Sequence, residues 1–192
     1  MTARTHDLAA ITALGALVFL EPLRTFTLGT ALMAILFNQL GGILPDIDQP
    51  TAPFWRNLPI GGVIGRVIDK TLGGHRFITH SILGVVLFSF LTHLLLTFLH
   101  PIIPTVNIGY VWWAFIIGMV SHLVMDTLTK EGVPWLLPIP FKFGLPPLKE
   151  FRITTGKAVE TWIVFPAILL LDVIFCASHY RLLVLFVHQH LI

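Results

Sequence analysis

Five long apolar segments constrain the fold of this chain more than any other feature. They cover residues 8–20, 26–44, 79–99, 108–125 and 161–178. A transmembrane helix needs roughly 20 mostly apolar residues, which the three middle segments provide, whereas the first segment is short. Only 11% of the 192 residues are charged, compared with about 25% in soluble domains. The sequence therefore predicts an all-α protein, a polytopic membrane helix bundle with about five transmembrane helices.

Two polar stretches, residues 46–78 and 129–160, interrupt the apolar segments. Both are rich in glycine and proline, which is typical of irregular loops or short interfacial helices. With five spans, the start of the chain and both stretches lie on the same side of the membrane, so the polar loops share one face. The start, MTARTHD, lacks the pattern of a cleaved signal peptide. We expect residues 1–192 to form a single integral membrane domain.

The basic residues are distributed unevenly between the two faces. Ten of them fall on the side of the polar loops, and only Arg24 and Arg181 fall on the other. Cytoplasmic loops of membrane proteins carry the excess of lysine and arginine, so this bias places the loops in the cytoplasm. The ten are Arg4, Arg56, Arg66, Lys70, Arg76, Lys130, Lys142, Lys149, Arg152 and Lys157.

Histidines and carboxylates gather at the same face, next to the ends of the apolar segments. Ionisable residues near the hydrocarbon are costly and tend to be functional. Since the starts of the first, third and fifth segments meet the ends of the second and fourth, we expect one polar site shared by all helices. Glu160 opens the fifth segment, and the candidate metal ligands are His6, Asp46, Asp48, His75, His80, His122 and Asp126.

The spacing of these residues favours metal binding. His122 and Asp126 are four residues apart, so a helix presents both on one side. Asp46 and Asp48 converge only in an extended turn, which their flanking prolines favour. We expect Thr79 to cap the third helix, with His80 in its first turn.

Imidazole and carboxylate ligands without thiolate indicate a divalent metal, zinc first, with manganese or iron as alternatives. The only cysteine, Cys176, excludes Cys-rich zinc sites. The candidates outnumber the ligands of one tetrahedral site, so either two metals bind or some candidates support the ligands.

Three motifs, LPDIDQP, GHRFITHS and SHLVMDTLTKEGVPWLLP, resemble those of membrane-bound metal-dependent hydrolases of bacterial inner membranes, some of which are described as LexA-regulated. The resemblance covers nearly the whole chain and implies a multi-pass inner-membrane protein. A more distant resemblance to helical zinc-dependent phospholipases C and nucleases implies phosphoester substrates. On this pattern the implied site residues are Asp46, Asp48, His75, His80, His122 and Asp126.

The function predicted from these residues is hydrolysis of a phosphoester at the cytoplasmic face, with an amphiphilic, lipid-linked ester favoured over a soluble one. A metal would activate water, Asp48 or Glu160 would act as general base, and Arg76 or Arg152 would neutralise phosphoryl charge. Membrane lipids are the expected partners, and nothing in the sequence fixes the oligomeric state. Nucleic acid is excluded because there is no basic helix or aromatic platform. Two alternatives use the same residues: a non-catalytic metal-binding or metal-transporting membrane protein, and a structural hydrogen-bond network.

Overall fold

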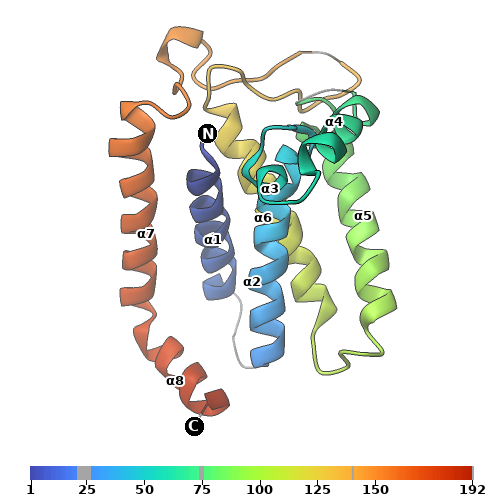
Figure 1. The fold of residues 1–192 in the computed structure, drawn as a ribbon. Helices are drawn as coiled ribbons and strands as arrows, with labels where there is room; N and C mark the ends of the chain where they lie inside the picture. The colour runs from blue at the N-terminus through green and yellow to red at the C-terminus, as the bar shows by residue number, and fades with distance from the viewer. Residues whose placement is uncertain (21–26, 74–75, 140, 192) are drawn as a thin grey trace.

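A computed structural model describes residues 1–20, 27–73, 76–139 and 141–191, and within these ranges it contains helices and no β-strand. Helix α6 packs against α1, α2 and α5, and α7 packs against α1 (Figure 1). The predicted all-α bundle is therefore confirmed. The long helices are α1 (Ala3–Leu20), α2 (Leu28–Ile43), α5 (Ile82–Leu99), α6 (Ile108–Thr127) and α7 (Phe165–Ser178), and the shorter ones are α3 (Pro53–Arg56), α4 (Gly61–Thr71) and α8 (Tyr180–Leu191).

Four segments of the described chain are long and apolar enough to cross a membrane. Helix α1 is not one of them, although it has 18 residues and runs beside the others (Figure 1). The described part of the chain thus has four candidate spans, and α1 runs alongside them. The four spans are Leu28–Asp48, Ile82–Leu99, Ile108–Thr127 and Glu160–Ser178.

The predicted meeting of helix ends is present. Figure 1 shows the starts of α1, α5 and α7 and the ends of α2 and α6 at one end of the bundle, together with the long connections. The C-terminal helix α8 follows a break at His179 and leads to the opposite end. At the site end a π-helical turn, Glu160–Val164, precedes α7, whose first turn contains Pro166. Helical turns already begin at residue 158, so Pro166 lies inside a continuous helix, directly after the π-helical turn. Proline has no amide hydrogen to donate, which is consistent with an irregular helical turn next to it.

Helices α2 and α6 touch along their backbones. A Cβ atom on Gly41 would overlap the carbonyl oxygen of Phe115, and one on Gly118 would overlap that of Asn38. The buried Asn38 amide donates to the carbonyl oxygen of Ala114 at 3.1 Å. These contacts fix the register of the two helices and bring the last turn of α2 next to the last turns of α6.

Two local predictions were wrong. Ser81, not Thr79, caps α5, because its hydroxyl accepts from the Gly84 amide at 3.1 Å. His80 therefore ends a 3-10 turn, Ile78–His80, instead of lying in the first turn of the helix. The pair Asp46 and Asp48 likewise lies in a 3-10 helix, Leu44–Asp48, and not in an extended turn. Pro45 suits this helix because its fixed φ matches a first helical position.

Candidate metal centre

His122 is held by the neighbouring helix in the state that a metal ligand requires. Its Nδ1 lies 2.7 Å from the carbonyl oxygen of Gly42 on α2. A carbonyl only accepts, so Nδ1 carries the hydrogen and Nε2 keeps its lone pair. Nε2 is buried and has no hydrogen-bond partner in the described part of the chain. A buried acceptor without a donor is costly, and a bound cation would satisfy it.

Two groups of donor atoms share His122. One consists of His6, His122 and Asp126, and the other of Asp46, His80 and His122; within each group the donor atoms lie within 4.8 Å of one another. Three imidazoles and two carboxylates match the chemistry of zinc, manganese or iron(II). The residues therefore fit a divalent metal ion.

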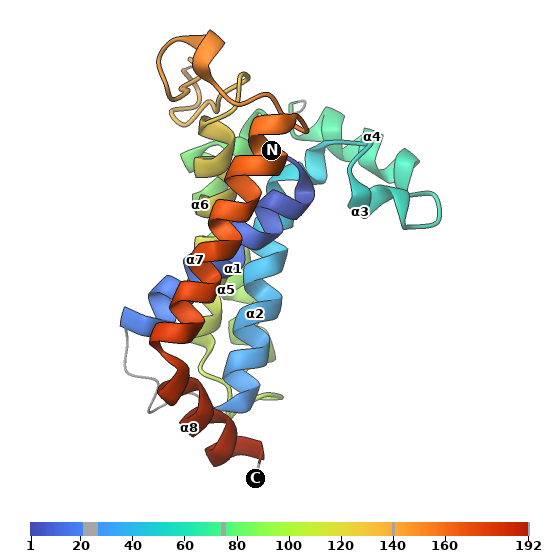
Figure 2. The ribbon, with the colours of Figure 1, turned by 90° about the vertical axis from the view of Figure 1, so that its left-hand side faces the viewer.

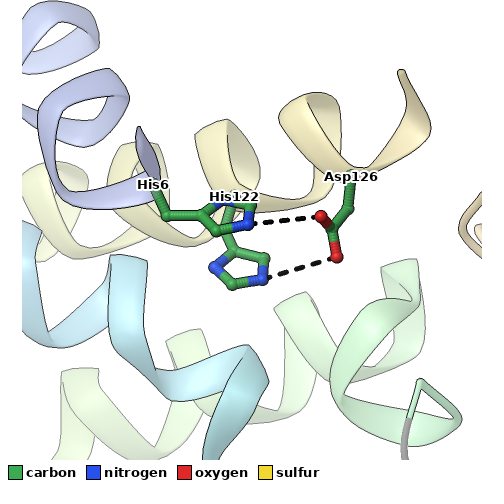
Figure 3. A group of neighbouring side chains, drawn as sticks. All are labelled: His6, His122 and Asp126. Atoms are coloured by element: carbon green, nitrogen blue, oxygen red, sulfur yellow. Dashed lines mark ion pairs between the residues drawn. The ribbon is translucent and has the colours of Figure 1, made fainter. Parts of the chain in front are cut away.

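Figure 3 shows the first group at the junction of α1 and α6. The His6 and His122 rings stack, with centroids 3.7 Å apart and planes 7° from parallel. The Nε2 atoms of His6 and His122 lie 3.2 and 3.8 Å from the two oxygens of Asp126. All three side chains are at most 2% exposed. The predicted pairing of His122 with Asp126 is thus present, and a histidine from the first helix joins it.

Asp126 also attracts positive charge from two other segments. The amino group of Met1 lies 2.5 Å from Oδ1, and the Arg76 guanidinium lies 2.5 Å from Oδ2. A buried carboxylate is stable only when paired or hydrogen-bonded. Asp126 therefore pairs with two cationic groups as well as with the histidines.

Arg76 adopts an unusual backbone conformation at this position. Its φ is +61°, in the left-handed region that residues other than glycine rarely occupy. Its guanidinium donates to the Thr129 hydroxyl at 3.3 Å and to the Gly132 carbonyl at 3.2 Å, while its Nε has no hydrogen-bond partner among the described residues. Backbone strain of this kind costs on the order of 1–3 kcal/mol and clusters at functional sites.

Asp46 and Asp48 approach opposite sides of His80. Asp46 Oδ1 lies 4.0 Å from His80 Nε2, and Asp48 Oδ2 lies 3.8 Å from His80 Nδ1. Asp48 accepts from the Thr79 hydroxyl, which is 2.9 Å from His80 Nδ1, and from the Arg76 amide at 3.1 Å. Carboxylates behind a histidine commonly orient it for metal binding. Asp48 therefore lies beside the two donor groups, not within either of them.

The remaining predicted residues are placed as follows. Glu160 Oε1 accepts from the Thr2 amide and from the Thr2 and Thr5 hydroxyls, and its Oε2 accepts from the Gly156 amide, at 2.7–2.8 Å. Glu160 thus ties α1 to the segment before α7. Arg152 donates to the carbonyl oxygens of Pro146 and Pro147 in its own loop. His75 lies outside the described residues.

A cavity of about 270 Å³ opens beside the donor groups. Its lining includes His6 and Asp46, together with Phe54 and Asn57 of the α3 region. Asp46 is 28% exposed, whereas the other four donor residues are almost fully buried. A small polar molecule can therefore reach the donors at the Asp46 edge.

Comparison of this sequence with known protein families finds a match to one family model. The model of the family described as "YdjM inner membrane protein" matches residues 1–188. The chain is 30% identical over 146 residues to the "Uncharacterized protein YvsG" of Bacillus subtilis, covering 76% of this chain and 79% of that protein. It is 35% identical over 126 residues to the "Inner membrane protein YdjM" of Escherichia coli, covering 63% of this chain and 56% of that relative. No solved structure matches.

Proposed function

Because this chain belongs to the YdjM inner membrane protein family, and because five potential ligands converge beside a cavity, we propose that it is a metal-dependent hydrolase. It would cleave a phosphoester at the cytoplasmic face of the bacterial inner membrane. The observation that supports this proposal best is the pair of donor groups that share His122. Their one open edge adjoins the cavity, where a substrate and water could meet a bound ion.

The residues of the chain have separate roles in this proposal. His6, Asp46, His80, His122 and Asp126 would hold the ion. Such an ion supplies Lewis acidity, so that a water beside it loses a proton near neutral pH. Asp48 is the better placed of the two candidate bases because it lies 3.8 Å from His80. Glu160 is engaged by four hydrogen bonds.

Arg76 is the better placed of the two arginines. It contacts Asp126 directly, and its Nε has no hydrogen-bond partner among the described residues, so one donor is available for an anion. Arg152 is engaged by carbonyl groups of its own loop. A guanidinium beside the donor groups would stabilise the charge that develops on a phosphoryl group.

Hydrolysis should depend on added metal. We expect purified protein loaded with Zn²⁺ or Mn²⁺ to hydrolyse bis(4-nitrophenyl) phosphate or 4-nitrophenyl phosphate, to lose this activity in a chelator, and to regain it when the metal is restored. Release of 4-nitrophenol is measured by its absorbance. Protein that binds metal tightly but leaves both esters intact would instead be a metal-binding or metal-transporting protein.

The proposed cytoplasmic orientation rests on the distribution of basic residues. Of the ten lysines and arginines assigned to this face, Arg4 lies in the first turn of α1, four lie between α2 and α5, and five lie between α6 and α7. Arg181 lies in α8. The positive-inside rule then directs the donor groups to the cytoplasm.

Cysteine labelling tests the orientation. In a Cys176→Ser background, single cysteines replacing the exposed Asn57, Glu131 and Glu150 should be inaccessible to a membrane-impermeant maleimide added outside spheroplasts. They should react fully when the membrane is opened. Cysteine at Thr105, in the connection between α5 and α6, is the matched control and should react from outside. The reverse pattern would reject the cytoplasmic site.

A further inference from the structure

An apolar groove of about 320 Å³ lies between α2 and α5, close to the candidate metal centre. Among the described residues that line it none is charged, and Thr92 is the most polar. Leu40, Leu91 and Leu95 are 43–48% exposed, so the groove opens sideways toward the lipid. Its walls include Phe37, Leu40 and Leu44 from the α2 side and Phe88, Leu91 and Leu95 from α5.

The groove and the site cavity are neighbours. Ile43 and Phe54 line both of them. The site cavity also presents His6 and Asp46, which belong to the two donor groups. A cavity with charged groups on its wall therefore lies beside an apolar groove that opens toward the lipid, and the two share these side chains as a common wall. A molecule with a charged head and one apolar chain would fill both spaces.

The position of Phe54 places this junction near the membrane surface. Phe54 belongs to α3, which with α4 projects from the side of the bundle at the site end (Figure 2). In and just before α4, Ile60, Val63, Ile64 and Val67 are exposed at helical spacing, a typical pattern for a helix lying in the interface. Arg66, Asp69 and Lys70 supply its polar residues.

Packing contacts hold this arm against the site. The Trp55 indole donates to the carbonyl oxygen of Ile47 at 2.9 Å, next to Asp46 and Asp48. A Cβ on Gly65 would lie about 3.0 Å from the Trp55 ring, so α4 packs closely on α3. The arm is thus positioned by the same 3-10 helix that carries Asp46.

We infer that the substrate is a lipid phosphoester, whose phosphate lies at the donor groups and whose apolar chain lies between α2 and α5. This inference rests on the proposed function for the chemistry at the phosphate. A phosphate at the Asp46 edge would be attracted by a cation bound at the donor groups. The chain would enter from the lipid without crossing a polar surface.

Photolabelling tests the inference independently of activity. Metal-loaded protein in detergent is irradiated with hexadecyl phosphate that carries a diazirine near the chain end. Labels are expected on the groove residues of α2 and α5, and excess hexadecyl phosphate, but not hexadecanol, should remove them. Leu91→Trp should reduce this labelling about 10-fold by filling the groove. Leu94→Trp is the matched control, since Leu94 is 50% exposed on the same helix but does not line the groove.

The outcomes separate the two proposals. Equal labelling of α5 and α7, or equal competition by hexadecanol, would mean that any chain occupies the groove and would overturn the inference. Hydrolysis of a soluble ester with no preference for long chains would also overturn it and leave the hydrolase proposal standing. Labelling that depends on both phosphate and Leu91, without hydrolysis of any ester, would uphold the lipid phosphoester site and reject the hydrolase.

Discussion

Replacing His122 and Asp126 together by alanine is expected to reduce the transition metal bound to the purified protein to background. His122 belongs to both donor groups, so its loss weakens both. In the double variant the first group retains only His6, and the second retains Asp46 and His80. Loss of residues that merely support ligands lowers metal affinity about 10–100-fold, and loss of the ligands themselves should exceed this range. Elemental analysis of the purified protein measures the effect.

His188→Ala is the matched control for this experiment. His188 is an exposed histidine on α8, at the end of the bundle away from the donor groups, so its removal should leave the metal content unchanged. Membrane insertion and helical content of the double variant should match those of the parent protein. Equal metal content in the double variant and the parent, or no metal in the parent after loading, would reject the metal centre.

Gly118→Ala is expected to destabilise the bundle by about 3 kcal/mol or more. The new methyl group would overlap the carbonyl oxygen of Asn38. This neighbour is helix backbone, so it cannot move aside like a flexible side chain. Helices α2 and α6 would have to separate, which would also lengthen the hydrogen bond from His122 to Gly42. Thermal unfolding in detergent, followed by circular dichroism, measures the loss.

Gly15→Ala provides the comparison. Gly15 lies inside α1, and nothing in the described structure comes within 4 Å of a Cβ placed there. Alanine is favoured over glycine by about 1 kcal/mol inside a helix, so this variant should be as stable as the parent or more stable. Similar unfolding midpoints for Gly118→Ala and Gly15→Ala would show that the close contact of α2 and α6 contributes little.

The apolar segments, together with the alternation of spans between the two membrane faces, were sufficient to predict the bundle and the end at which the candidate site residues meet. The segment predicted at 108–125 is α6, Ile108–Thr127, and the pair His122 and Asp126 lies together as its spacing requires. These features depend on local sequence, on helix geometry and on the alternation of spans. They can be predicted without knowing which helices touch.

Features that depend on contacts between segments could not be predicted in the same way. The acceptor for His122 is the backbone carbonyl of Gly42, and every residue has a carbonyl, so the sequence carries no signal for it. Thr79 was expected to cap a helix, but its hydroxyl lies between Asp48 and His80. The divergence of Asp46 and Asp48 follows from the 3-10 helix that begins where α2 ends.

The hydrogen bond between His122 and Gly42 also restricts how His122 could be shared between ions. With Nδ1 engaged by the carbonyl, His122 has a single lone pair, on Nε2, and that pair can bind only one ion at a time. An ion held by all three members of one donor group would leave the other group with two protein ligands. Two kinds of metal would then compete for His122.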